Sequence, residues 1–360
     1  MIVLGAFFLA FSLFYAVMGL SRPHWAFALV VFLFPLKQVL QSYIPLLISF
    51  NFAVNAFVAV AAGFAALLRI QRDGLDIRSY LNPVTYACFG LYTMVFLGLW
   101  YTPAPEYARS TFFGALPYHV LYLIITPLLL RTLDEFRSAL LPVIVGGAVV
   151  GLGIMTNPKA FYHHGRLILD LGQSMGTSEY LGNPLAIADM GGTLVVLAAL
   201  MVPAPGNRLF SIIRNGGIVA GLGIAVASGS RGQVLAAVFV SVLFYGLARK
   251  VKNPAQFFGT VFGLAALGGV LYGVFKFFSS GDAADRWSMS FTGQGSGLDD
   301  RLNRIVSSFN AYLGSPGSWF QGLGTSSFAV FSGSGVEGTY PHNLLIEVLC
   351  DYGLIGMTCL

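Results

Sequence analysis

Residues 2–20 read IVLGAFFLAFSLFYAVMGL and contain no charged side chain. An α-helix of about 20 mostly apolar residues is long enough to cross the hydrocarbon core of a bilayer. No basic residue precedes this stretch and no small-residue cleavage site follows it, so it predicts a membrane span and not a cleaved signal peptide.

The same window finds ten further apolar stretches along the chain. They are 25–43, 53–70, 84–101, 112–130, 138–156, 184–202, 212–229, 232–248, 257–279 and 343–360. The first of these is interrupted by Pro35 and Lys37, and Pro45 follows just after it. Hydrophobic residues make up 56% of the chain and charged residues 10%, against about 25% charged in a soluble domain. The sequence therefore predicts an all-α, polytopic transmembrane helix bundle of about eleven spans, with the lipid bilayer as its surroundings. It excludes a disordered chain and a disulfide scaffold.

The charged loops orient these spans. Cytoplasmic loops carry an excess of Lys and Arg. One set of alternating connections is rich in such residues: Arg22, Arg69, Arg72, Arg78, Arg131, Arg137, Arg208, Arg214, Arg249, Lys250 and Lys252. We therefore expect this set in the cytoplasm and the two long loops, 157–183 and 280–341, on the outer side. The net charge of +5 is spread over these loops with no basic cluster on a polar face, which predicts no nucleic-acid partner.

Segment 280–341 is long for a membrane-protein loop but rich in aromatic residues, which a solvated linker would lack. Within 301–313, helical spacing relates Leu302, Ile305, Phe309 and Tyr312, and Gly314 and Pro316 follow. We expect an amphipathic helix on the outer rim of the membrane. The chain then divides into a bundle (1–279), an outer loop subdomain (280–341) and a last span (342–360).

Arg231 stands in Ser228-Gly229-Ser230-Arg231-Gly232, a tight outer hairpin between two spans. Its guanidinium could extend to the lipid headgroups. Alternatively it binds a phosphate or carboxylate through its two parallel N–H groups, with the glycines admitting a ligand close to the backbone.

Arg301 and Arg304 are one helical turn apart at the start of the loop helix and share a face. They either form a solvated face paired with Asp299 and Asp300, or point together into one site. The two aspartates suit a helix N-terminus better than a metal site.

His342 opens the last span after Tyr340-Pro341, with Asn343 next and Glu347 five residues further on. An imidazole at the membrane boundary can be structural, or it can act as a general base near neutral pH.

The sequence contains no clear metal site and no cofactor-binding motif. His163 and His164 lie near Asp170 and Glu179 without metal-ligand spacing, and Cys88, Cys350 and Cys359 stand in apolar segments. No phosphate-binding loop, nucleophile elbow or dinucleotide fingerprint is present. We expect no metal and no cofactor.

Several of these features together resemble the bacterial O-antigen ligase and polymerase superfamily. They are Ser230-Arg231-Gly232, a long outer loop that opens with Arg301 and contains Pro316 and Gly322-Leu323-Gly324, and the run Pro341-His342-Asn343, Glu347, Tyr352-Gly353-Leu354-Ile355-Gly356. The resemblance covers roughly residues 220–360. Members usually continue with one or two more spans, so we expect the chain to be short at its C-terminus.

The resemblance implies a GT-C-like glycosyltransferase of the bacterial inner membrane, with its active site facing the periplasm. Such a protein transfers a glycan from an undecaprenyl-diphosphate carrier to lipid A core, a growing polysaccharide or a protein. By the same resemblance Arg231 and Arg301 bind the diphosphate and His342 activates the acceptor. Ser230, Arg304, Tyr340, Asn343 and Glu347 are expected to bind substrate.

Two other classes remain as alternatives. A small-anion or polysaccharide transporter would place its ionisable groups near the bilayer midplane, whereas here they gather at outer helix ends and in one loop; Asp189 is the only acidic residue clearly within an early span. A non-catalytic subunit of an export assembly is the other. Ligase and polymerase are not distinguished by these residues.

Overall fold

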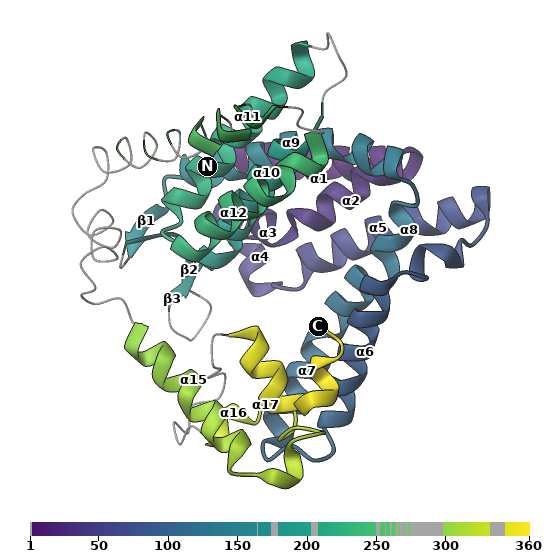
Figure 1. The fold of residues 1–360 in the computed structure, drawn as a ribbon. Helices are drawn as coiled ribbons and strands as arrows, with labels where there is room; N and C mark the ends of the chain where they lie inside the picture. Colours follow the sequence, from purple (N-terminus) through teal and green to yellow (C-terminus); the bar gives the residue numbers. More distant parts are fainter. Residues whose placement is uncertain are drawn as a thin grey trace. The chain divides into compact units, whose positions relative to one another are not determined.

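The computed structural model describes residues 2–163, 165–173, 179–202, 208–249, 298–331 and 343–360, with short pieces between 253 and 273. It divides into two compact units (Figure 1). The first contains residues 1–74 and 129–292, and the second contains 75–128 and 293–360.

Within the described residues, five helices are long and apolar enough to cross a membrane, or six if one bent pair counts as a span. This confirms a polytopic helical membrane protein, and the total of eleven spans stays a prediction. In the first unit the single long helices are α1 (Ile2–Ser21), α5 (Ala53–Asp73), α9 (Leu133–Met155) and α11 (Arg208–Ala227). The shorter α10 (Pro184–Leu200) and α12 (Arg231–Arg249) accompany them.

The bent pair is the second predicted span. It consists of α2 (Pro23–Val31) and α3 (Leu33–Tyr43), which meet at 71°. Proline has no N–H to donate to the carbonyl four residues earlier, and its ring collides with that carbonyl. For Pro35 that carbonyl belongs to Val31, so the chain bends at Phe32, just before the proline. The short α4 (Leu46–Ser49) follows.

Glycines bring α10 and α11 into close contact. A Cβ on Gly191 would lie 2.7 Å from the backbone nitrogen of Ala225, and one on Gly221 would lie 2.8 Å from the carbonyl oxygen of Gly191. Small residues at helix interfaces let backbones approach closely inside a membrane, where dispersion contacts replace the hydrophobic effect. This interface helps to position the connection between α11 and α12.

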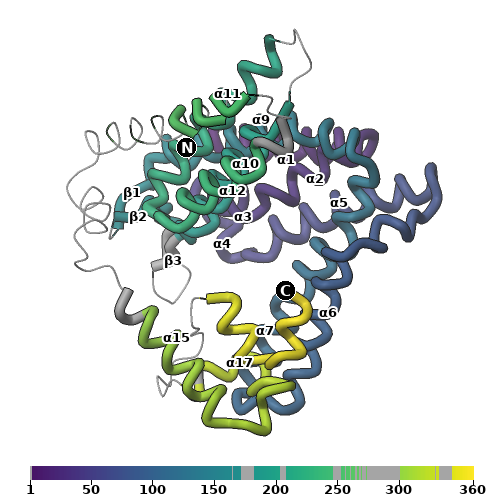
Figure 2. The backbone as a smooth tube through the Cα atoms, in the orientation of Figure 1, coloured from purple at the N-terminus to yellow at the C-terminus, as the bar shows by residue number. Residues whose placement is uncertain are grey.

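Segment 157–183, which was predicted as an outer loop, contains a small antiparallel sheet that the all-α prediction missed. Its order is β1 (Ala160–His163), β2 (Arg166–Gln173) and β3 (Glu179–Leu181) (Figures 1 and 2). The side chains of Leu167, Leu169 and Leu171 are buried, which anchors β2 on the bundle. Ile168 between them is buried as well, so this run lacks the alternation of buried and exposed residues that predicts a strand.

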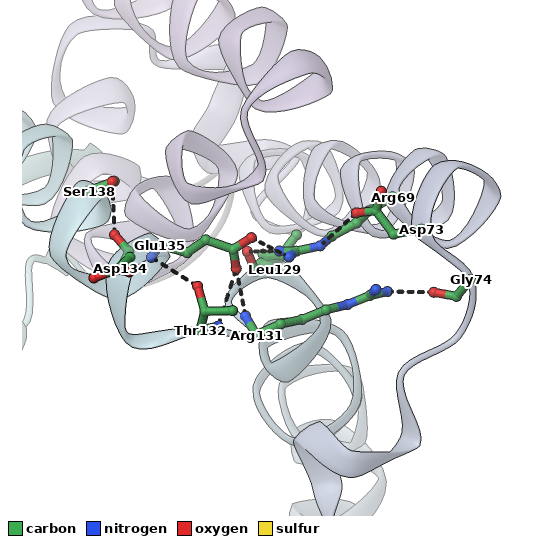
Figure 3. Close-up of polar contacts among 9 residues, drawn as sticks. All are labelled: Arg69, Asp73, Gly74, Leu129, Arg131, Thr132, Asp134, Glu135 and Ser138. Carbon is green, nitrogen blue, oxygen red and sulfur yellow. Dashed lines mark hydrogen bonds and ion pairs between the residues drawn. The ribbon is translucent and has the colours of Figure 1, made fainter.

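A polar cluster closes one end of the first unit (Figure 3). The Arg69 side chain is 7% exposed, donates to the Leu129 carbonyl oxygen at 2.8 Å and forms an ion pair with Glu135. Glu135 also completes a capping box with Thr132 at the start of α9. The predicted cytoplasmic arginine Arg69 is thus bound into the fold by a carboxylate and a carbonyl group.

The second unit contains the remaining helices. They are η1 (Ile77–Tyr80), α6 (Pro83–Gly98), α7 (Pro105–His119), the π-helical turn η2 (Val120–Ile125) and α8 (Thr126–Leu129), followed after 293 by α15 (Leu298–Leu313), η3 (Pro316–Ser318), α16 (Phe328–Phe331) and α17 (Leu344–Met357). Residues 105–129 together form one of the five candidate spans.

Candidate functional site

Arg231 is the first residue of α12, at the end of a three-residue turn from α11. The turn is held by its own serines: the Ser228 hydroxyl donates to the Ala225 carbonyl oxygen at 2.6 Å, and the Ser230 N–H donates to the Ser228 hydroxyl oxygen at 3.3 Å. The Val234 N–H donates to the Ser230 carbonyl oxygen at 3.3 Å, so Ser230 begins the helical hydrogen bonding. The half-buried Arg231 side chain therefore leaves the backbone at a fixed helix N-terminus.

This turn packs directly on the β1–β2 hairpin. Gly229 has φ +68°, and a Cβ there would lie 2.2 Å from the carbonyl oxygen of Gly165, which also has a positive φ of 68°. Only glycine tolerates both the backbone conformation and the close approach. Gly229, which follows Ser228 in the motif, thus fixes the position of Arg231 against the β1–β2 hairpin.

In the second unit, Arg301 and Arg304 lie in the first two turns of α15, one exposed and the other half-buried. The helix observed begins three residues before the predicted 301–313 and ends at the same residue. Asp299 and Asp300 fall in its first turn, the position expected from helix electrostatics.

The apolar residues of α15 divide between two faces. Tyr312 is buried and its hydroxyl donates to the Trp319 carbonyl oxygen at 2.7 Å. Burial, and then the neighbouring Cys350, raise the pKa of this phenol, which stays a neutral donor. A second face is exposed and carries Leu302, Val306, Phe309 and Leu313 at helical spacing. That face suits an amphipathic helix lying on a membrane surface.

The loop after α15 fills a break in α17. At Gly353 the backbone takes φ +62° and ψ −159°, so the helical hydrogen bonds across it are absent. The Leu323 and Gly324 N–H groups donate to the Cys350 and Asp351 carbonyl oxygens at 2.8 and 3.0 Å. In return the Leu354 and Ile355 N–H groups donate to the carbonyl oxygens of Trp319 and Phe320 at 2.9 and 3.1 Å, so the loop supplies partners to the groups that the break exposes.

This arrangement explains two glycine motifs noted in the sequence. A Cβ on Gly322 would lie 2.2 Å from the Asp351 carbonyl oxygen, and one on Gly353 would lie 2.4 Å from the Phe320 carbonyl oxygen. Gly322-Leu323-Gly324 is therefore a backbone-packing motif that positions the loop against α17.

Asp351 is a buried carboxylate that sequence reasoning did not single out. It accepts hydrogen bonds from the Ser326 N–H at 2.9 Å and from the Ser327 hydroxyl at 2.6 Å. Ser326 has a positive φ of 59°, and Asp351 stabilises this unusual conformation. Its spacing of four residues from Glu347 was the available signal.

Asn343 and Glu347 lie at the start of α17. The Asn343 side chain caps the helix by accepting from the Ile346 N–H at 3.2 Å. Glu347 lines a small pocket with Ser308 of α15, Ser327 and Asp351, with room for about one water molecule. Helices α15 and α17 pack against each other, and in Figure 1 their first turns lie at the same end of the two helices. The second unit thus brings the helix starts that carry Arg301, Arg304, Asn343 and Glu347 to one side.

Tyr340 and His342 lie outside the described residues, as does most of the predicted span 257–279. Arg231 and Ser230 belong to the first unit, and the other described candidates belong to the second.

Asp189 lines a groove of about 230 Å³ between α10 and α12, together with Thr193 and Gln233. Among the described residues, no group of three or more His, Cys, Asp or Glu side chains could hold a metal ion.

Residues 216–360 match the family model described as O-antigen ligase, which supports assignment to the O-antigen ligase superfamily. The family indicates glycan transfer in lipopolysaccharide biosynthesis, and the apolar helices indicate a multi-pass membrane protein. No curated protein and no solved structure matches the chain.

Proposed function

We propose that this protein transfers a glycan from an undecaprenyl-diphosphate carrier to an acceptor hydroxyl at the outer face of the bacterial inner membrane. The observation that carries the proposal is the extent of the family match, since 216–360 includes Arg231, Arg301 and His342. The acceptor is lipid A core, a growing polysaccharide or a protein. Both ligase and polymerase activity use the same donor and the same chemistry.

The leaving group of this reaction is a diphosphate, so the enzyme has only to stabilise its negative charge as it departs. The acceptor oxygen attacks the anomeric carbon, the bond from that carbon to the diphosphate oxygen breaks, and undecaprenyl diphosphate departs with the bonding electron pair. Negative charge grows on the departing phosphate, and fixed cations in a water-poor site stabilise it. Arg231 and Arg301, with Arg304 beside it, would supply those cations, so the mechanism needs no metal.

The acceptor must lose its proton as it attacks. His342 would take this proton as a general base, a role for which an imidazole is suited near neutral pH. Attack from the side opposite the diphosphate would invert the anomeric centre. Asn343, Glu347, Tyr340 and Ser230 would then bind or orient the two substrates.

The glycine-fixed turn supports the role of Arg231. A guanidinium on a rigid helix start is preorganised, because neither the turn nor the hairpin has to rearrange as charge develops. The N-terminus of α12 adds unbonded backbone N–H groups and a favourable dipole for an anion.

The test is a transfer assay with purified protein, a labelled undecaprenyl-diphosphate glycan and lipid A core. We expect His342→Ala to lower the rate by roughly 10²–10⁴-fold and Arg231→Ala by roughly 10²–10³-fold. His24→Ala on α2 and Arg137→Ala on α9 serve as matched controls and should stay near wild type. Labelled lipid A core identifies a ligase and longer carrier-linked glycan a polymerase; full activity in both His342→Ala and Arg231→Ala would refute the mechanism.

A further inference from the structure

The tip of the β1–β2 hairpin carries a cation that the proposed mechanism has not used. His163 and Arg166 are cross-strand partners there, with Gly165 between them in the turn. Arg166 is half-buried and begins β2. Directly opposed residues in an antiparallel pair project from the same face of the ribbon.

The glycine contact brings this tip to the start of α12. A Cβ on Gly229 would lie 2.2 Å from the Gly165 carbonyl oxygen and 3.2 Å from the Arg166 Cα. Arg231 follows Gly229 by two residues. Consecutive Cα atoms are about 3.8 Å apart, so the Cα atoms of Arg166 and Arg231 are at most about 12 Å apart. Two long arginine side chains can reach one ligand across that distance.

We propose that Arg166 is a second diphosphate-binding residue, juxtaposed with Arg231 by the backbone contact between Gly165 and Gly229. The inference rests on the proposed function and adds to it a residue outside the segment that matches the family. A diphosphate offers two phosphate groups, and one guanidinium binds one such group through two parallel hydrogen bonds. Arg231 and the α12 N-terminus would bind one phosphate, and Arg166 the other.

The ligand class follows from this pairing. A monophosphate would occupy only one of the two positions, so removing Arg166 should weaken binding of a diphosphate far more than binding of a monophosphate. A residue that only maintained the fold would weaken both equally. The preference for diphosphate over monophosphate is therefore the quantity to measure.

The experiment compares binding of undecaprenyl diphosphate and undecaprenyl monophosphate to the full chain in lipid nanodiscs. We expect Arg166→Gln to weaken diphosphate binding by about 10–100-fold, the range for hydrogen bonds to charged groups, and to change monophosphate binding by less than about threefold. Arg166→Lys should restore part of the preference, because lysine keeps the charge without the bidentate geometry.

Lys159→Gln is the matched control, since Lys159 is an outer cation of the same hairpin that lies beside Asp170 at the end away from the tip. An unchanged preference in Arg166→Gln would overturn the inference, as would an equal loss in Lys159→Gln. If Arg231→Gln loses binding while Arg166→Gln does not, only this inference fails. If the wild-type protein neither prefers the diphosphate nor transfers glycan, the proposed function fails as well.

Discussion

The Ser327 hydroxyl donates a hydrogen bond of 2.6 Å to the carboxylate of Asp351, and both residues are buried. The same carboxylate accepts from the Ser326 N–H. One acidic side chain of α17 therefore holds the loop that follows α15, and it lines the same pocket as Glu347.

Removing that carboxylate should destabilise the second unit. We expect Asp351→Ala to lower the free energy of unfolding by about 1–3 kcal/mol, because the Ser326 N–H and the Ser327 hydroxyl lose a buried partner. Chemical unfolding in detergent micelles measures the change. Asp134→Ala is the control: that side chain is 88% exposed and should change stability by less than about 0.5 kcal/mol. Equal stability of the two variants would show that Asp351 does not hold the loop.

The break in α17 should require glycine. At Gly353 an L-residue meets both an unfavourable backbone conformation and the Phe320 carbonyl oxygen, 2.4 Å from the position of its Cβ. We expect Gly353→Ala to lower the unfolding free energy by about 1–3 kcal/mol or more. Gly317→Ala, where a Cβ meets nothing within 4 Å, should stay close to wild type. Thermal unfolding of both variants in the same detergent tests this, and an unaffected Gly353→Ala would contradict it.

The turn before Arg231 should also require glycine at position 229. Gly229→Ala forces an L-residue into the left-handed backbone conformation, which costs about 1–2 kcal/mol of folding free energy. The added Cβ also pushes the turn away from Gly165. We therefore expect lower stability together with a loss of transfer activity, since Arg231 is displaced. Gly223→Ala on α11, where a Cβ meets nothing within 4 Å, should keep both properties. A Gly229→Ala protein with normal activity would mean that the contact does not position Arg231.

The polar cluster of the first unit gives a prediction on stability alone. Arg69→Met leaves Glu135 without its ion-pair partner, and breaking a buried pair costs about 3–5 kcal/mol. Glu135 is 34% exposed, so we expect a value near the lower limit. Arg137→Met removes a pair whose side chains are 65% and 88% exposed and should change stability by less than about 1 kcal/mol. Parallel denaturant titrations compare the unfolding free energies of the two variants. Similar losses in both would contradict the conclusion that the Arg69 ion pair is buried and the Arg137 pair exposed.

The sequence predicted the helices well because length and hydropathy decide a membrane span. Residues 2–20 and 53–70 fall within α1 and α5, and the bend near Pro35 was also visible as an interruption. The sheet in 157–183 was not predicted, because its pairing depends on contacts with the bundle. The break at Gly353 was also hidden, since apolar residues continue on both sides of it.

The positions of two candidate site residues can be compared with the sequence prediction, whereas their functional roles stay predictions. The sequence placed Arg231 in a hairpin before a span and Arg301 at the start of a loop helix; in the structure Arg231 is the first residue of α12 and Arg301 lies in the first turn of α15. The role of Gly229 could not be predicted, because its partner Gly165 is distant in sequence. The roles of Tyr340 and His342 stay predictions.

The contact between Gly165 and Gly229 also constrains how the protein is made. The hairpin leaves the ribosome well before the turn that rests on it, and chains generally assemble from the N-terminus during synthesis. Helices α10 and α11 lie between the two glycines in the sequence, so both must be synthesised before the glycines can meet. The geometry around Arg231 is therefore completed late in biogenesis, so a nascent chain would acquire this turn only after most of the first unit is in place.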